Sequence, residues 1–387
     1  MRLQMVEIQQ SFPVRYDYAV TFTRRAFDLG NPTLRHVLAS AGSFRHRVLP
    51  VIDSGVLAAD TTLAERLLVY ADAHADAIDL ADELLVVRGG EACKSDTSEV
   101  DRLHDAIGRH RLCRHSFVLV IGGGAVLDAM GFAAAVAHRG VRIVRMPTTV
   151  LAQNDAGIGV KNAINHLGRK NFLGTFAPPF AVIDDFDFLR TLPARELRSG
   201  IAEAVKVALI KDRDFFDHLR RVRRQLAIFD RELLEDLIVR CAELHLEHIR
   251  TSGDPFELGS ARPLDFGHWA AHRLEELSGA ELRHGEAVAI GLALDSLYSQ
   301  RLGMIGEAEL HAILSTLEEI GFTLHHPTLA QLDVQIALAN FREHLGGDLC
   351  ITLLQEIGRG IEVHEIDLGI MRKCVDFLLQ RGEAGPC

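Results

Sequence analysis

The sequence predicts an α/β N-terminal half followed by a mostly helical C-terminal half, with a boundary near residue 190. In the first half, short β-branched runs alternate with helical patterns, which is typical of a parallel sheet. From about Pro193 onward, helical patterns follow one another almost without strands. The 387 residues would make roughly two or three domains. We expect two, at residues 1–190 and 191–387.

The elements of each half follow from the period of the apolar residues. In the first half we expect strands at 47–53, 83–87, 117–121 and 142–146, and helices at 63–77, 100–111 and 125–137. The run 117–121 is apolar throughout, as expected for a strand buried on both faces. Residues 1–15 are expected to form a short extra strand or a tail. In the second half we expect helices at 194–210, 214–229, 232–249, 269–277, 284–301 and 307–320, and a strand at 349–354.

The composition argues against several functional classes. With 42 Lys+Arg against 53 Asp+Glu, the net charge of −11 disfavours a general binder of nucleic acids or anionic membranes. The most apolar long window, 117–137, contains three consecutive glycines and Asp128, so we expect no membrane span. No signal peptide is visible, and the six cysteines show no CxxC spacing. We therefore expect a cytoplasmic protein with unpaired thiols.

Three consecutive glycines, Gly122, Gly123 and Gly124, join an expected strand to an expected helix. Such a turn lets the backbone and the helix N-terminus approach a pyrophosphate. The spacing is not GxGxxG, and a tight strand–helix turn is the alternative explanation. Asp53 ends an earlier strand, where its carboxylate would either accept hydrogen bonds from ribose hydroxyls or cap a helix.

Two further groups of residues suggest binding of an anion and a metal. Lys161, Lys170 and Asn171 lie in a polar, glycine-containing segment and would suit an anionic substrate, although a solvated loop explains them equally well. One carboxylate and two imidazoles bind Zn²⁺ in open catalytic sites, and Glu203, His268 and His284 are the candidates. Spacing alone does not bring these three together, and each histidine would also suit an ordinary hydrogen-bonded role.

Taken in order, these segments resemble the sugar phosphate cyclases, the family of 3-dehydroquinate synthase. The matching stretches are 122–128, 131–132, 139–140, 147–161, 170–174, 191–193, 201–206, 265–268 and 284–289, so the resemblance covers most of the chain. It implies an α/β NAD⁺-binding domain, an all-helical metal-binding domain, an active site in the cleft between them, and a homodimer. It also implies a small sugar phosphate as substrate, and neither a nucleic acid nor a membrane as partner.

The resemblance also implies a role for individual residues. The metal ligands, for Zn²⁺ or Co²⁺, are Glu203, His268 and His284. The NAD⁺ contacts are Asp53, Glu91, Lys94, Gly122, Gly123, Gly124, Asp128, Thr148, Thr149, Lys161 and Lys170. The substrate contacts are Arg139, Lys161, Lys170, Asn171, Lys206, Asp265 and His272, with Arg139 reaching the site of the other subunit. Catalytic roles fall on Asp155, Lys161, Lys206 and His272.

The chemistry implied by the resemblance uses NAD⁺ as a recycled cofactor. A substrate hydroxyl is transiently oxidised, phosphate leaves by β-elimination, and the ketone is reduced again. The sugar ring then opens, and an intramolecular aldol step closes a carbocycle. Lysines that hold the leaving phosphate stabilise the developing charge.

Departures from the 3-dehydroquinate synthase pattern concern the substrate carboxylate. Asp265 replaces an Asn, Ala261 falls where an Arg is usual, and an ungapped count places Glu247 where a Lys is usual. His272 is retained, and Arg342 and His344 are candidates for the family's C-terminal phosphate-binding Lys. We therefore expect a ketose phosphate without a carboxylate, such as sedoheptulose 7-phosphate. The alternatives are a true 3-dehydroquinate synthase, a metal-dependent polyol dehydrogenase of the glycerol dehydrogenase type, and a non-catalytic relative.

Overall fold

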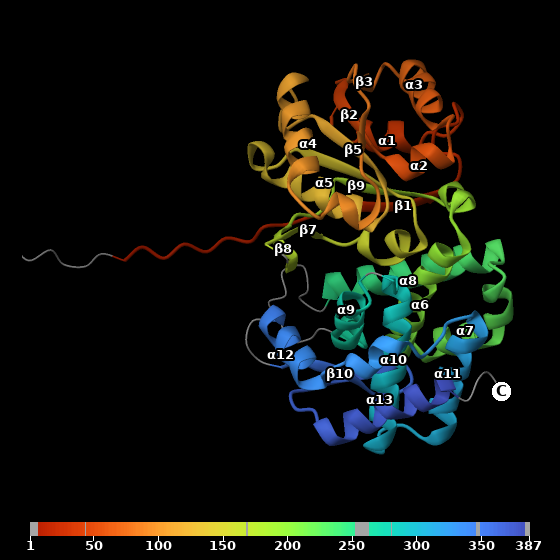
Figure 1. Ribbon diagram of the computed structural model, residues 1–387. Coiled ribbons are helices and arrows are strands. Elements are labelled where there is room, and N and C mark those ends of the chain that lie inside the picture. Colours follow the sequence, from red (N-terminus) through yellow and green to blue (C-terminus); the bar gives the residue numbers. More distant parts are fainter. Residues whose placement is uncertain are drawn as a thin grey trace, which may run out of the picture.

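The structure is a computed structural model that describes residues 7–42, 44–167, 169–251, 263–279, 281–345 and 349–383. The α/β half and the helical half lie one above the other, and an extended N-terminal segment projects from the body (Figure 1). Within the described residues, no helix is long and apolar enough to cross a bilayer. The expected order of the two halves along the chain is confirmed.

A seven-stranded parallel sheet forms the centre of the α/β half. Its order is β1-β9-β6-β5-β2-β3, and β4 also pairs with β2. The strands are β1 (Ala19–Thr23), β2 (His46–Asp53), β3 (Ile78–Leu80), β4 (Leu85–Val87), β5 (Phe117–Gly122), β6 (Arg142–Pro147) and β9 (Ala181–Asp185). All six residues of β5 are buried, as the apolar run predicted. Strands β1, β3 and β9 are additions to the prediction.

Helices cover both faces of this sheet. Helices α1 (Thr33–Ala39) and α3 (Leu63–Ala73) pack on one face, and α4 (Ser98–Arg109) and α5 (Gly124–Val136) pack on the other. The remaining elements of this half are α2 (Ser54–Ala59), the 3₁₀ turns η1 (Gly90–Cys93), η2 (Ala137–Arg139) and η4 (Phe186–Thr191), and the π-helical turn η3 (Ala152–Ala156). A separate antiparallel hairpin, β7 (Lys161–His166) and β8 (Arg169–Phe176), lies in the segment predicted to be polar.

The helical half is built around α10 (His284–Arg301). From Ala287 to Ser299 every residue of α10 is buried. The helices around it are α6 (Ala194–Lys211), α7 (Arg213–Ala227), α8 (Arg231–Thr251), α9 (His268–Leu277), α11 (Glu307–Ile320), α12 (Val334–Leu345) and α13 (Leu368–Glu383), with the 3₁₀ turns η6 (Pro263–Asp265) and η7 (Pro327–Gln331). This half is not purely helical, because it contains the hairpin β10 (Ile351–Glu356) and β11 (Arg359–Val363), whose first strand was predicted.

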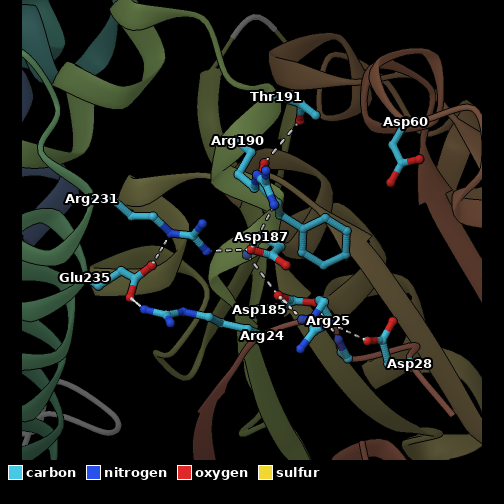
Figure 2. Close-up of polar contacts among 12 residues, drawn as sticks. Arg24, Arg25, Asp28, Asp60, Asp185, Asp187, Arg190, Thr191, Arg231 and Glu235 are labelled. Carbon is cyan, nitrogen blue, oxygen red and sulfur yellow. Dashed lines mark hydrogen bonds and ion pairs between the residues drawn. The ribbon is translucent and has the colours of Figure 1, made fainter. Parts of the chain in front are cut away.

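A network of ion pairs joins helix α8 of the helical half to the loops that follow β1 and β9 (Figure 2). Arg231 of α8 lies 2.6 Å from the Asp187 carboxylate and 2.8 Å from Glu235. Glu235 also pairs with Arg24, in the loop that follows β1. The next residues of that loop, Arg25 and Ala26, donate backbone hydrogen bonds to the buried Asp185 carboxylate. The loop after β1 and the turn after β9 are therefore both fixed against α8.

Candidate functional site

Three side chains that are far apart in the sequence converge between α6, α9 and α10. The Glu203 Oε1 atom lies 3.2 Å from the Nε2 atom of His284 and 3.5 Å from the Nε2 atom of His268. All three ligand atoms lie within 4.8 Å of one another. A tetrahedral metal with bonds of about 2.0–2.1 Å holds its ligands roughly 3.3–3.4 Å apart. The spacing and the donor types therefore fit a zinc-type site with an open fourth position.

Close backbone packing holds the three ligand-bearing segments in place. A side chain on Gly285, next to His284, would overlap the backbone of Ser199 in α6. A side chain on Gly291, further along α10, would overlap the carbonyl of Gly267, which precedes His268. Gly267 has a φ of +78°, which glycine adopts without strain. Glycines thus let α10 approach both neighbouring segments closely.

Hydrogen bonds orient the two imidazoles. The Nδ1 atom of His268 lies 3.1 Å from the Phe266 carbonyl oxygen, so Nδ1–H donates and Nε2 is left to bind a metal. The Nδ1 atom of His284 lies 3.5 Å from Glu275 Oε2. Carboxylate and carbonyl partners of this kind fix the tautomer and ring orientation of metal-binding histidines. The sequence did not point to Glu275.

Lys206 lies one helical turn after Glu203 and is 2% exposed. Its ammonium group pairs with the Glu203 carboxylate and lies 3.6 Å from Asp155 Oδ2. Burial alone would raise the pKa of Glu203, but Lys206 and His268 outweigh it and hold that pKa well below the usual value. Burial opposes the charge of Lys206, but Glu203 and Asp155 raise its pKa. We therefore treat both groups as charged.

The site formed by Glu203, His268 and His284, here called the metal-type site, opens into a cleft of about 530 Å³ between the two halves. This volume lies within the usual range of small-molecule pockets, which is about 300–1,000 Å³. The sequence-predicted residues that line it are Asp128, Asp155, Lys161, Asn171, Lys206, Asp265, His268 and His272. The π-helical turn η3 supplies Asp155, and the hairpin β7–β8 supplies Lys161 and Asn171. Lys170 lies beside the cleft, 3.7 Å from Glu275 Oε2.

The expected nucleotide end of the site lies at the carboxyl ends of β2, β5 and β6. The helices that follow β2 and β5, α3 and α5, pack on opposite faces of the sheet, so these neighbouring strands flank a topological switch point, where α/β sheets bind ligands. Helix α5 begins after Gly123, which has no side chain to cap it. Side chains on Gly123 or Gly124 would press against Thr149 or Ala156. The glycine turn is therefore a tightly packed, half-buried helix N-terminus, a kind of position that suits phosphate.

Other expected cofactor residues lie around this edge. Asp53 Oδ1 accepts a 2.7 Å hydrogen bond from the Gly55 backbone, so this carboxylate caps α2, which was one of the two explanations considered. Thr148 is buried, and its backbone donates to the carbonyl of Gly122. Lys94 Nζ lies 2.6 Å from both Asp128 Oδ2 and Asn171 Oδ1. Lys94 therefore links α5 to the hairpin that carries Lys161.

Some expected residues lie away from the cleft. Arg139 is exposed on a separate surface pocket that Cys113 and Arg114 also line, so within one chain it does not meet the metal-type site. Glu91 and Arg342 are exposed. Ala261 lies outside the described residues, as does the side chain of His344.

The placement of Glu247 at the substrate was wrong. Its carboxylate lies 2.7 Å from Arg250 and is 53% exposed, on the outer face of α8. His245 and His248 line the cleft instead, because residues three apart share a face of a helix. His245 Nδ1 lies 3.2 Å from Asp155 Oδ1. Burial, with Lys211 nearby, lowers the pKa of His248 to about 4.

Sequence reasoning missed His245, His248 and Arg145. The i, i+3 spacing of the two histidines on a predicted helix was the signal that would have found them. Arg145 lies inside the apolar strand β6 and is fully buried. It donates to the carbonyls of Gly157 and Gly159 at 3.0 and 2.8 Å, and so fixes the segment that leads from η3 to Lys161.

Two family comparisons match consecutive parts of the chain. Residues 84–199 match the family described as 3-dehydroquinate synthase N-terminal, and residues 200–345 match the 3-dehydroquinate synthase C-terminal family. Together they cover more than half of the chain and contain the three metal-type ligands.

Several solved structures share this fold. The fold superposes with a TM-score of 0.86 on 2-epi-5-epi-valiolone synthase from Streptomyces hygroscopicus subsp. jinggangensis 5008, a structure with NAD⁺ and Zn²⁺ bound. The two are 32% identical over 97% of this chain and 100% of that chain. A 2-deoxy-scyllo-inosose synthase, complexed with carbaglucose-6-phosphate, NAD⁺ and Co²⁺, matches at 21% identity and a TM-score of 0.72, over 92% and 95% of the chains. A probable glycerol dehydrogenase from Sinorhizobium meliloti 1021 shares the fold at 18% identity and a TM-score of 0.56, over 95% and 97%.

Proposed function

We propose that this chain, which belongs to the 3-dehydroquinate synthase-like family of sugar phosphate cyclases, cyclises a ketose phosphate that lacks a carboxylate. The expected substrate is sedoheptulose 7-phosphate, and the product is a carbocyclic ketone formed with release of phosphate. We further propose a cytoplasmic homodimer of two-domain subunits that serves cyclitol biosynthesis.

The proposed substrate is chosen from the charges of the residues that line the cleft. Among the described residues that line the cleft, the permanent cations are Lys161 and Lys206, and the carboxylates are Asp128, Asp155 and Asp265. Lys206 is paired with Glu203 and Asp128 is paired with Lys94, so the comparison that remains is Lys161 against Asp155 and Asp265. A substrate with both a phosphate and a carboxylate would therefore face an excess of negative charge. A substrate whose only strong charge is its phosphate suits this wall better.

The histidines on α8 support the same choice. His245 contacts Asp155, and burial keeps His248 neutral at physiological pH. A neutral imidazole, as in His248, suits hydroxyl groups, which donate and accept hydrogen bonds, better than it suits a carboxylate. The 32% identity to a valiolone synthase over nearly the whole chain agrees with this assignment.

The proposed cofactors are NAD⁺ and Zn²⁺ or Co²⁺. A divalent metal, when bound by Glu203, His268 and His284, would polarise a substrate hydroxyl oxygen. NAD⁺, when bound at the glycine turn, would supply the transient oxidation of that hydroxyl. Contacts to it are assigned to Asp53, Glu91, Lys94, Gly122, Gly123, Gly124, Asp128, Thr148, Thr149, Lys161 and Lys170.

The remaining polar residues are assigned to substrate and proton handling. Lys161, Lys170 and Asn171 project from the hairpin and would hold the phosphate, whose departure they would assist by stabilising negative charge. Lys206 and Asp155 lie 3.6 Å apart beside the metal-type site, where they would orient the reacting hydroxyl. His272 and Asp265 also line the cleft and would position the sugar. Arg139 is assigned to the site of the other subunit.

Phosphate release tests the proposal. Purified protein with NAD⁺ and Zn²⁺ should release phosphate from sedoheptulose 7-phosphate at least tenfold faster than from the seven-carbon keto-acid phosphate that 3-dehydroquinate synthase uses. His245→Lys adds a cation to the wall and should shift this ratio toward the keto acid. Preference of the native protein for the keto acid would refute the substrate assignment. Net NADH formation from a polyol, without phosphate release, would favour a glycerol dehydrogenase-type activity instead.

A further inference from the structure

Arg145 places a positive charge in the core of the α/β half. It lies in β6, between β5 and β9, and its side chain is fully buried. Burial lowers the pKa of Arg145 and Asp128 raises it, and an arginine stays protonated in proteins. A buried charge is costly unless its donors are satisfied by hydrogen bonds. The acceptors of those hydrogen bonds therefore show what this cation holds in place.

The four acceptors all lie in one short segment, residues 157–162, here called the connecting segment. One terminal nitrogen of the guanidinium donates to the carbonyls of Gly157 and Gly159, at 3.0 and 2.8 Å. The other donates to the side-chain oxygen of Asn162 at 2.5 Å and to the carbonyl of Lys161 at 3.4 Å. A single planar group thus fixes the path of the chain over six residues.

The connecting segment joins two residues that line the cleft. Asp155 precedes it in η3, and Lys161 lies within it, at the first position of β7. Successive side chains of a strand point to opposite faces, and Asn162 is 2% exposed whereas Lys161 is exposed. The guanidinium and the carbonyl of Ala177 hold the Asn162 side chain in the core. Anchoring Asn162 in this way turns Lys161 toward the cleft.

Helix α5 makes room for this anchor at a glycine. A side-chain carbon on Gly131 would overlap the side-chain oxygen of Asn162 and lie 3.5 Å from a terminal nitrogen of Arg145. Glycine is unfavourable in the middle of a helix compared with alanine, so this position gives up helix stability for space. Gly131, Arg145 and Asn162, here called the buried trio, therefore form one packed unit.

We infer that the buried trio positions Asp155 and Lys161 relative to each other, and that Arg145 is the positioning residue that acts on both. Arg145 is not among the described residues that line the cleft, so it acts through the segment that it holds. A guanidinium suits this role because its donors diverge in one plane, whereas the ammonium of a lysine is a point charge. The use of Asp155 and Lys161 in catalysis rests on the proposed function.

Hydrogen–deuterium exchange of the full-length protein tests the positioning without turnover. Arg145→Lys keeps the charge but loses the planar fork, so amide exchange within residues 157–162 should become at least tenfold faster. Exchange in β5 and β9 should stay within threefold of the native rates. Arg142→Lys is the matched control, because Arg142 lies in the same strand but packs over Phe117 and Phe180, and it should leave the connecting segment within threefold. Unchanged exchange in the segment, or a uniform increase across the sheet, would overturn the inference.

Kinetics of phosphate release test what the positioning does. Gly131→Ala favours the helix but presses on the Asn162 oxygen, so kcat/KM for sedoheptulose 7-phosphate should fall at least tenfold while zinc affinity stays within twofold. Gly108→Ala, in α4, is the control, because a methyl group there meets open space, and it should leave kcat/KM within twofold. In an Asn162→Ser background the displaced atom is gone, so Gly131→Ala should then change kcat/KM less than twofold. An equal loss in both backgrounds would refute the role of the trio.

The two measurements separate this inference from the proposed function. If the native protein releases no phosphate from any sugar phosphate, the proposed function fails, and the exchange rates decide the positioning by themselves. If the native protein releases phosphate but Arg145→Lys changes both kcat and KM less than twofold, the proposed function stands and the positioning role is refuted. The expected result is a kcat/KM at least tenfold below the native value.

Discussion

Replacing Lys206 with methionine should destabilise the metal-free protein much more than the zinc-loaded protein. Lys206 is 2% exposed and pairs with Glu203, which is fully buried, while Asp155 lies 3.6 Å away. Methionine keeps most of the side-chain volume of lysine but leaves the carboxylates of Glu203 and Asp155 without the ammonium group. A bound divalent cation would supply positive charge to the same carboxylates, so zinc should restore much of the lost stability.

The expected size follows from the burial of the pair. Removing one partner of a buried ion pair costs roughly 3–5 kcal/mol. Unfolding of a helical half of roughly 190 residues has an entropy of roughly 0.4 kcal/mol per degree, so the metal-free variant should melt roughly 8–12 °C lower. Differential scanning calorimetry of chelator-treated and zinc-reconstituted protein measures both values. Lys373→Met, at an exposed position of α13, is the control and should leave the melting temperature unchanged. A loss that is equal with and without zinc, or below about 2 °C, would refute the reasoning.

Three further predictions concern the same half of the molecule. Gly291→Ala would force a methyl group onto the Gly267 carbonyl and displace His268, so zinc affinity should fall at least tenfold in a chelator competition. Gly30→Ala is the control, because a methyl group there meets open space, and it should leave zinc affinity unchanged. Glu275→Gln weakens the partner of His284 Nδ1 and should reduce zinc affinity roughly 10–100-fold; unchanged affinity would show that this contact does not orient the ring. Burial raises the pKa of Asp295 to about 7, although Trp269 and Gly267 donate to it. Because the folded protein then binds this proton more tightly than the unfolded chain, its contribution to stability is complete below about pH 4 and is lost as the pH rises through about 7. Urea unfolding from pH 4 to 8 should show this decline, and Asp295→Asn should flatten it.

Local patterns predicted much of the secondary structure. The α10 and α11 boundaries, His284–Arg301 and Glu307–Ile320, were predicted to the residue. The prediction lacked strands β1, β3, β9 and β11, the hairpin β7–β8, and helices α1, α2, α12 and α13. Strand β1 is a short part of a longer alternating segment, and the hairpin consists largely of exposed residues. Such strands depend on their neighbours more than on their own composition.

The residues that line the cleft show why a side chain cannot be placed by counting positions along the chain. An ungapped count placed Glu247 toward the substrate, but a shift of one position on α8 turns the side chain by about 100° and moves it from the cleft to solvent. His245 and His248 take the inner face instead. Arg139, by contrast, was assigned to the site of the other subunit, and it lies on a surface of its own chain that is separate from the cleft.

By itself, the sequence determined the kind of chemistry available: the order of the motifs, one carboxylate and two imidazoles for a metal, a glycine turn for a nucleotide, and lysines for a phosphate. These features are local, since they depend on residue type and on spacing within a helix or turn. Only the tertiary structure decided that Glu203 and His284, 81 positions apart, lie 3.2 Å from each other. That convergence depends on backbone contacts at Gly285 and Gly291, where α10 meets its neighbours. The closeness of two distant segments is a property of packing, and no periodicity along the chain records it.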